Sequence, residues 1–86
     1  MAAVLMYCTA ACPFCQSAER LLVEKGATIE KVRVDLEAER RGEMTQRSGR
    51  RTVPQIWIGE RHIGGCDDLY ALDRKGGLDP LLQGTP

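Results

Sequence analysis

The chain has 86 residues, and its 12 basic and 12 acidic residues give a formal net charge of +0. A chain of this length forms one small domain, over residues 1–86, with one hydrophobic core. The balanced charge, with no basic face predicted along the chain, argues against nucleic acid as a partner.

The cysteines indicate a thiol site and not a disulfide scaffold. Three of the four cysteines, Cys8, Cys12 and Cys15, lie close together, whereas secreted scaffolds spread their cysteines along the chain. The first residues lack the charged and apolar regions of a signal peptide, and no apolar run approaches the roughly 20 residues that cross a membrane. We therefore expect a cytoplasmic protein without membrane contact.

The first half of the chain predicts a strand, a helix and a second strand. Residues 2–7 are mostly apolar and predict a short buried strand. Residues 13–25 predict a helix that ends at Gly26, with an apolar stripe formed by Phe14, Ala18, Leu21 and Leu22. A second strand is expected over residues 29–35, where apolar residues lie among charged ones.

The second half predicts an exposed helix, a hairpin and a further helix. Residues 37–48 are polar and predict a helix that ends at Gly49, with Leu36 and Met44 as its contacts to the core. Residues 53–58 and 61–63 predict two strands around a tight turn. Another helix is expected from about residue 67 to residue 75, followed by one short turn over residues 79–82.

The predicted order of elements is β-α-β-α-β-β-α. A strand, a helix and a strand of these lengths form a right-handed parallel unit, and the hairpin then adds antiparallel strands beside it. We therefore expect an α/β fold with a four-stranded mixed sheet and helices on both faces.

The stretch Cys12-Pro13-Phe14-Cys15 carries the predicted chemistry. Pro13 suits the first position of a helix, which places Cys12 at the helix N-terminus. The N–H groups and the dipole at that end favour a thiolate on Cys12, which makes it a nucleophile. Cys15, one turn further on, can resolve a mixed disulfide formed on Cys12, and the pair therefore predicts thiol–disulfide exchange.

Two metal sites are alternatives for the same cysteines. A CxxC pair is half of a zinc site, and the only further Cys or His ligands are Cys8, His62 and Cys66. The spacing CxxxCxxC from Cys8 onward also occurs in radical enzymes with a four-iron cluster, but this chain is too short for their barrel. We expect no metal, a buried structural role for Cys8, and an ordinary strand position for His62.

The stretch Thr52-Val53-Pro54 is the second motif. A cis bond between Val53 and Pro54 would turn the Val53 N–H and C=O outward, where they can pair with a peptide-like ligand lying across Cys12. The alternative is a trans proline that starts an edge strand. The CxxC helix upstream favours the cis form.

The stretch Gly64-Gly65-Cys66-Asp67-Asp68 is the third motif. Paired glycines permit close approach of the backbone, and the N–H groups at the following helix start can bind an anion. Asp67 can accept hydrogen bonds from an ammonium group, so the stretch fits a zwitterionic amino-acid end such as the γ-glutamyl group of glutathione. A capping loop without a ligand is the alternative, and Cys66 is expected to contribute its backbone.

Together these stretches resemble the glutaredoxins, most closely the bacterial glutaredoxin 3 type. The resemblance covers nearly the whole chain through residues 12–15, 48–50, 52–56, 62–69 and 76–78. It implies a thioredoxin-like fold and a glutathione-dependent thiol–disulfide oxidoreductase that reduces glutathione mixed disulfides and protein disulfides. It also implies that Cys12 is the nucleophile that becomes glutathionylated and that Cys15 is the resolving thiol.

The resemblance implies a set of glutathione contacts as well. These are Phe14, Thr52, Val53, Pro54, Gly65, Cys66 and Asp67. The chain departs from the family at Thr9, where a Lys is frequent, and at Phe14, where a Tyr is common. We hypothesise that Arg47, Arg50 or Arg51 supplies the positive charge that is missing at Thr9.

Two other functions are compatible with the same residues. The first is a glutaredoxin-like electron donor reduced by thioredoxin reductase, which the glutathione-like fit of residues 64–67 disfavours. The second is a dimeric carrier of a two-iron cluster held by Cys12 and glutathione. Cluster carriers of the family typically have Gly after the first cysteine and often lack the second, so Pro13 and Cys15 disfavour this reading. We expect a monomer whose partners are glutathione and glutathionylated or disulfide-containing proteins.

Overall fold

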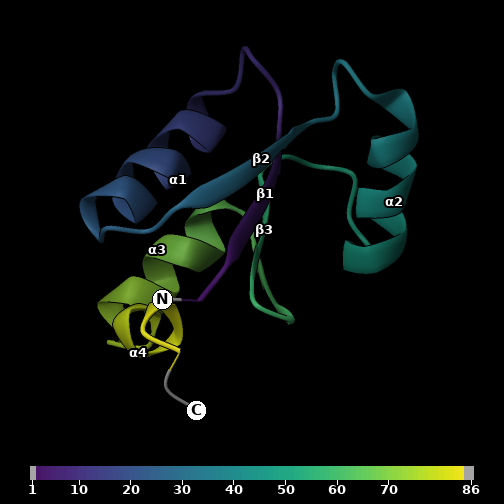
Figure 1. Ribbon diagram of the computed structural model, residues 1–86. Coiled ribbons are helices and arrows are strands. Elements are labelled where there is room, and N and C mark those ends of the chain that lie inside the picture. Colours follow the sequence, from purple (N-terminus) through teal and green to yellow (C-terminus); the bar gives the residue numbers. More distant parts are fainter. Residues whose placement is uncertain (1, 85–86) are drawn as a thin grey trace.

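A four-stranded sheet forms the centre of the molecule in the computed structural model, which describes residues 2–84 (Figure 1). The strand order is β2-β1-β3-β4. The strands are β1 (Val4–Cys8), β2 (Ile29–Arg33), β3 (Gln55–Ile58) and β4 (Arg61–Gly64). β1 pairs with β2 in parallel, whereas β3 is antiparallel to both β1 and β4, so the predicted mixed sheet is confirmed.

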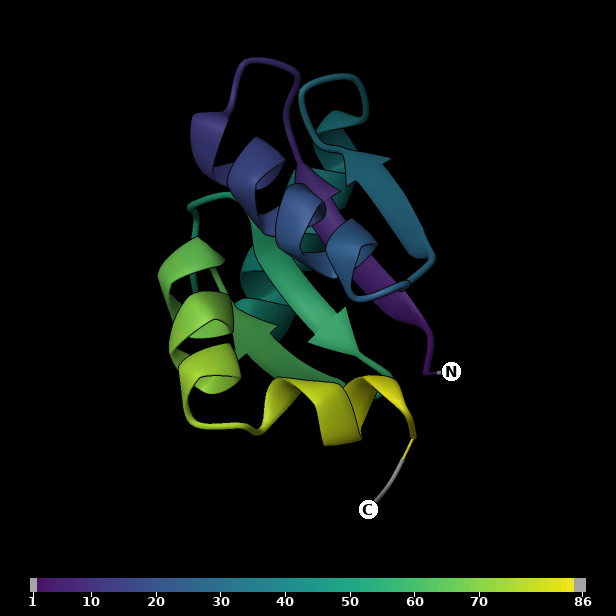
Figure 2. The same ribbon diagram turned by 90° about the vertical axis from the view of Figure 1, so that its left-hand side faces the viewer.

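Helices cover both faces of this sheet, as predicted. The helices are α1 (Pro13–Glu24), α2 (Ala38–Ser48), α3 (Cys66–Arg74) and α4 (Leu78–Leu82). α1, α3 and α4 lie on one face and α2 lies alone on the other (Figure 1). The view in Figure 2 shows α1 and α3 side by side over the strands. The Tyr70 hydroxyl joins these two helices by donating to the Ser17 carbonyl at 3.0 Å.

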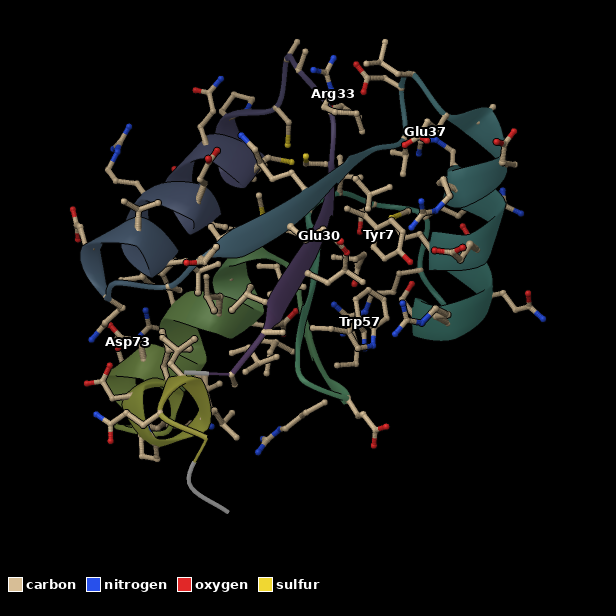
Figure 3. All side chains as sticks on the ribbon, viewed as in Figure 1. Tyr7, Glu30, Arg33, Glu37, Trp57 and Asp73 are labelled. Atoms are coloured by element: carbon tan, nitrogen blue, oxygen red, sulfur yellow. The ribbon has the colours of Figure 1, made fainter. Side chains whose placement is uncertain are left out.

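The core is divided by the sheet into two clusters. Side chains alternate along β1, as the period of a strand requires, so Met6 and Cys8 face α1 while Tyr7 faces α2. Tyr7 and Trp57 fill the space between the sheet and α2 (Figure 3), with their ring centroids 5.4 Å apart. The Tyr7 hydroxyl donates to the Glu43 carboxylate and accepts from Arg47 at 3.1 Å. These polar contacts hold the largely charged helix α2 on the sheet.

Of the two residues predicted to join α2 to the core, one is buried and one is exposed. Met44 is 0% exposed and packs in the smaller cluster, as expected. Leu36 was expected beside it, but its side chain is 73% exposed. The second strand ends at Arg33 and not at Asp35, and the chain then turns through residues 34–36. Leu36 therefore lies on an outward turn instead of on the buried face of the helix.

The predicted stripe of α1 is wrong at its first residue. Phe14 is 63% exposed, whereas the buried residues of this helix are Cys15, Ala18, Leu21 and Leu22. Positions 15, 18 and 22 follow the helical repeat that a single docked face requires. Phe14 also fits this repeat, but it lies in the first turn of the helix, and its ring remains at the surface.

The remaining boundaries differ only slightly from those predicted. The strand expected from Val53 begins at Gln55, and the last short helix begins at Leu78. In the third helix, Leu69 is fully buried and Leu72 packs against the larger cluster. Within residues 2–84, no helix has the length and apolar character needed to span a membrane.

Candidate active site

Cys12 lies at the N-terminus of α1, where the sequence predicted it. It is the N-cap residue, with extended backbone angles of φ −131° and ψ 99°, and Pro13 follows as the first helical residue. The Cys12 Sγ accepts a hydrogen bond from the Cys15 backbone N–H at 3.1 Å. An N–H donor at the positive end of the helix dipole stabilises a thiolate more than a thiol.

Cys15 lies one helical turn further along α1. Its side chain is 3% exposed, and burial is the main reason that its pKa rises from 9.0 to about 12. A hydrogen bond to the Cys12 side chain raises the pKa further, while the backbone N–H of Thr9 opposes this shift. Cys15 therefore holds its proton at neutral pH, so the two thiols of the motif have different chemical roles available to them.

The Val53–Pro54 peptide bond is cis, as predicted. The loop that contains it lies against the first turn of α1, and the Cys12 Sγ is 3.9 Å from the Val53 carbonyl oxygen. On its other side the loop approaches the start of α3. A Cβ at Gly65 would lie 3.3 Å from the Pro54 carbonyl oxygen, so this close approach favours glycine.

A buried polar pair holds this loop from beneath. Gln55 is 0% exposed, and its Nε2 donates to the Thr52 carbonyl at 3.0 Å. Its Oε1 lies 2.8 Å from the His62 Nε2, which must therefore carry the proton. Burial lowers the pKa of His62, whose ring also packs on Trp57 at a centroid distance of 4.5 Å. Gln55 was not among the predicted site residues, although a polar residue within an apolar strand is a signal for a buried polar contact.

The three predicted motifs meet around one open cavity of about 300 Å³. Its lining comes from the first turn of α1, the loop before β3 and the start of α3: Phe14, Arg50, Thr52, Val53, Pro54, Gly65, Cys66, Asp67 and Asp68. All seven residues predicted as glutathione contacts are among them. The exposed ring of Phe14, which was wrongly predicted to lie in the core, forms part of the lining of this cavity.

Asp68 organises the rim of the cavity. Its Oδ2 accepts from the Gly65 backbone N–H at 2.9 Å and from the Arg50 Nη1 at 2.8 Å. The Arg50 guanidinium is the main reason that the pKa of Asp68 lies below its usual value. Asp68 was predicted only as the last residue of the third motif, with no contact of its own. A carboxylate three residues after the N-cap is a known capping signal and could have identified this contact.

Comparison with known proteins identifies the family. The Glutaredoxin family model matches residues 4–63. Glutaredoxin 3 of Escherichia coli K12 is 55% identical over 83 residues, which cover 96% of this chain and 100% of that protein. The chain belongs to the glutaredoxin family. It is therefore a thiol–disulfide oxidoreductase with a thioredoxin-like fold.

Solved glutaredoxin structures have the same fold. The solution structure of glutaredoxin from Brucella melitensis has a TM-score of 0.84 and 47% identity, and the match covers 100% of this chain and 95% of that one. The crystal structure of a buckwheat glutaredoxin–glutathione complex has a TM-score of 0.88 and 31% identity, and covers 94% and 76% of the two chains.

The structure separates the three arginines that were candidates to replace the family's Lys. Arg50 lines the cavity. Arg47 lies on the α2 side, with its guanidinium carbon 4.4 Å from the centre of the Trp57 ring. Arg51 lines a different cavity, beside α2. Arg50 is thus the one of the three that this glutaredoxin places beside its cysteine motif.

Over residues 2–84, no three Cys, His, Asp or Glu side chains are grouped so that they could hold a metal ion. All four cysteines are free thiols.

Proposed function

We propose that this glutaredoxin reduces glutathione mixed disulfides through Cys12. The Cys12 thiolate attacks the glutathione sulfur of a glutathionylated protein, the new disulfide forms on Cys12, and the protein leaves as a thiolate. A second glutathione thiolate then attacks the glutathione sulfur bound to Cys12. Glutathione disulfide leaves, and the Cys12 thiolate is regenerated.

Protein disulfides follow a second route that uses both cysteines. Cys12 attacks one sulfur of the substrate disulfide and forms a mixed disulfide with the protein. Cys15 then loses its proton and attacks the Cys12 sulfur, so the protein leaves as a dithiol and a Cys12–Cys15 disulfide remains. Two glutathione molecules reduce that disulfide and form one glutathione disulfide. A reduction potential of about −200 to −230 mV for the Cys12–Cys15 couple allows the glutathione pool to do so.

The observation that carries this proposal is the position of the Cys12 Sγ, which accepts an N–H at a helix start beside a cavity suited to glutathione. The outward backbone of Val53 can pair with the cysteine portion of glutathione. The N–H groups at the start of α3 and the Asp67 carboxylate suit the γ-glutamyl carboxylate and ammonium. Arg50 can pair with a carboxylate. The similarity to the buckwheat glutathione complex supports this assignment.

The experiment is turnover of a small glutathione mixed disulfide, coupled to glutathione reductase. The parent and Cys15→Ser are expected to turn it over, because this route needs Cys12 alone, and Cys12→Ser is expected to be inactive. Cys15→Ser is expected to lose reduction of protein disulfides. Activity that depends on thioredoxin reductase, with none from glutathione, would instead support the electron-donor alternative.

A reducing compartment such as the cytoplasm suits this chemistry. The glutathione pool there keeps thiols reduced, and the four cysteines of this chain are free. Its partners would be glutathione and proteins that carry glutathione adducts or accessible disulfides.

A further inference from the structure

Cys8 is a buried thiol that the proposed mechanism does not use. It is the last residue of β1, its side chain is 4% exposed, and it packs in the same core cluster as Cys12 and Cys15. Cys8 and Cys15 together line an open cavity of about 310 Å³, with Thr9, Lys31 and Arg33. This cavity shares no lining residue with the one proposed for glutathione.

Both other thiols act on Cys15. Its thiol is hydrogen-bonded to the Cys12 side chain, and it also receives the backbone N–H of Thr9, the residue that follows Cys8. The cavity reaches Cys8 and Cys15 but not Cys12. We propose that Cys8 is a third redox thiol, which attacks Cys15 in the Cys12–Cys15 disulfide and releases Cys12. This inference rests on the formation of that disulfide in the proposed function.

The exchange balances without any added oxidant. The Cys8 thiolate attacks the Cys15 Sγ, the Cys8–Cys15 bond forms, and the Cys12–Cys15 bond breaks. Cys12 leaves as a thiolate with the bonding electron pair, and the proton of Cys8 passes to solvent through the cavity. One disulfide is present before and after. Cys12 suits the leaving position because the Cys15 N–H and the helix N-terminus stabilise its negative charge.

The consequence concerns the state of Cys12. With the disulfide between Cys8 and Cys15, the chain is still oxidised by two electrons, but Cys12 is again a free thiolate. A new glutathione mixed disulfide can then react at Cys12 before the internal disulfide has been reduced. In a chain limited to Cys12 and Cys15, the internal disulfide blocks that reaction.

The pKa of Cys8, which burial and nearby charges shift, determines the pH dependence of the exchange. Burial raises the pKa of Cys8, Lys31 and Arg33 on β2 oppose this shift, and Glu19 and Asp35 add to it. The thiolate is therefore a minor species at neutral pH. Since the thiolate is the attacking form, the exchange is expected to accelerate about tenfold per pH unit below the pKa of Cys8.

Differential alkylation of the parent protein tests the proposal without any substitution. The protein is oxidised with glutathione disulfide, quenched and denatured in acid, and labelled with N-ethylmaleimide at acidic pH. It is then reduced and labelled with the deuterated reagent. No Lys or Arg precedes Arg20, so one tryptic peptide carries all three thiols, and its fragment ions assign each label. A chain with one internal disulfide carries two deuterated labels.

The proposal predicts chains with the light label on Cys12 and deuterated labels on Cys8 and Cys15. The fraction of chains with this pattern is expected to reach its plateau faster as pH rises. Cys66, on a separate peptide, serves as the internal reference and keeps the light label. Cys8→Ser is expected to abolish this pattern.

Other labelling patterns contradict the proposal in distinguishable ways. Light label on Cys8 in every oxidised chain, with Cys12 and Cys15 deuterated, would overturn the role of Cys8 and leave the proposed function intact. In chains with two deuterated labels, light label on Cys15, or deuterated label on Cys66, would show a different pairing and also overturn it. If Cys12 and Cys15 both keep the light label, the inference and the dithiol route of the proposed function fail together.

Discussion

Cys12 and Cys15 are one helical turn apart, and the burial of Cys15 has a consequence for stability. Folding raises the pKa of Cys15 from 9.0 to about 12, mainly through burial. Between these values the unfolded chain releases a proton that the folded chain retains. The unfolded state then binds fewer protons, so the free energy of unfolding falls as pH rises above the ordinary thiol pKa.

We therefore predict that Cys15→Ser reduces this alkaline loss of stability. Urea unfolding of the parent and the variant, on both sides of the ordinary thiol pKa, measures the difference. Some pH dependence is expected to remain, because burial also raises the pKa values of Cys8 and Cys66. Equal pH dependence in parent and variant would contradict the assignment of the buried proton to Cys15.

A second prediction at this scale concerns Arg50. Its guanidinium lines the proposed glutathione cavity, whereas Arg51 lines another. Removing one charge-assisted contact to a carboxylate weakens binding about tenfold, so Arg50→Ala is expected to raise the KM for glutathione by about that factor with little change in kcat. Arg51→Ala is the matched control and is expected to leave both unchanged. A larger effect for Arg51→Ala than for Arg50→Ala would contradict the assignment and show that Arg51 supplies the positive charge.

Single residues were predictable where their chemistry is local. Cys12 and Cys15 could be assigned from sequence because an N-cap, a proline and one helical turn lie within four residues. Arg50 could not be separated from Arg47 and Arg51, because only the path of the chain after α2 decides which side chain reaches the cavity.

At the scale of elements, α2 offers a direct comparison of two apolar residues. Met44 is fully buried between α2 and the sheet, and Leu36 is exposed on the turn before the helix. Met44→Ala is expected to lower the free energy of unfolding by about 2–4 kcal/mol, since it leaves a cavity in the smaller cluster. Leu36→Ala is expected to change it by less than about 0.5 kcal/mol. Denaturant unfolding of both variants checks this, and a comparable loss in Leu36→Ala would contradict its outward position.

Periodicity predicted the elements and their order, but not every contact between them. The hairpin and the third helix were predictable because their apolar and glycine patterns are regular. The Gln55–His62 pair was not, because the pairing of β3 with β4 shifts register between Ile56 and Trp57. Such a shift depends on packing across the sheet and has no local signal in the sequence.

At the scale of the whole molecule, we predict that freshly purified protein is colourless and monomeric. Among the residues that the structure describes, the large exposed apolar side chains are Phe14, Val23 and Leu36. Phe14 and Val23 lie toward opposite ends of α1 and Leu36 precedes α2, so they form no continuous apolar patch. Size-exclusion chromatography and a visible absorption spectrum of anaerobically purified protein test this. A brown dimer would support the cluster-carrier alternative.

The central claim is that Cys12 is the thiol that accepts glutathione. Cys15→Ser is incubated with glutathione disulfide, digested without reduction and analysed by mass spectrometry, so that the adduct on Cys12 cannot be resolved by Cys15. We predict one glutathione per chain, bound to Cys12. An adduct on Cys8 or Cys66 with Cys12 unmodified, or no adduct at all, would contradict the account.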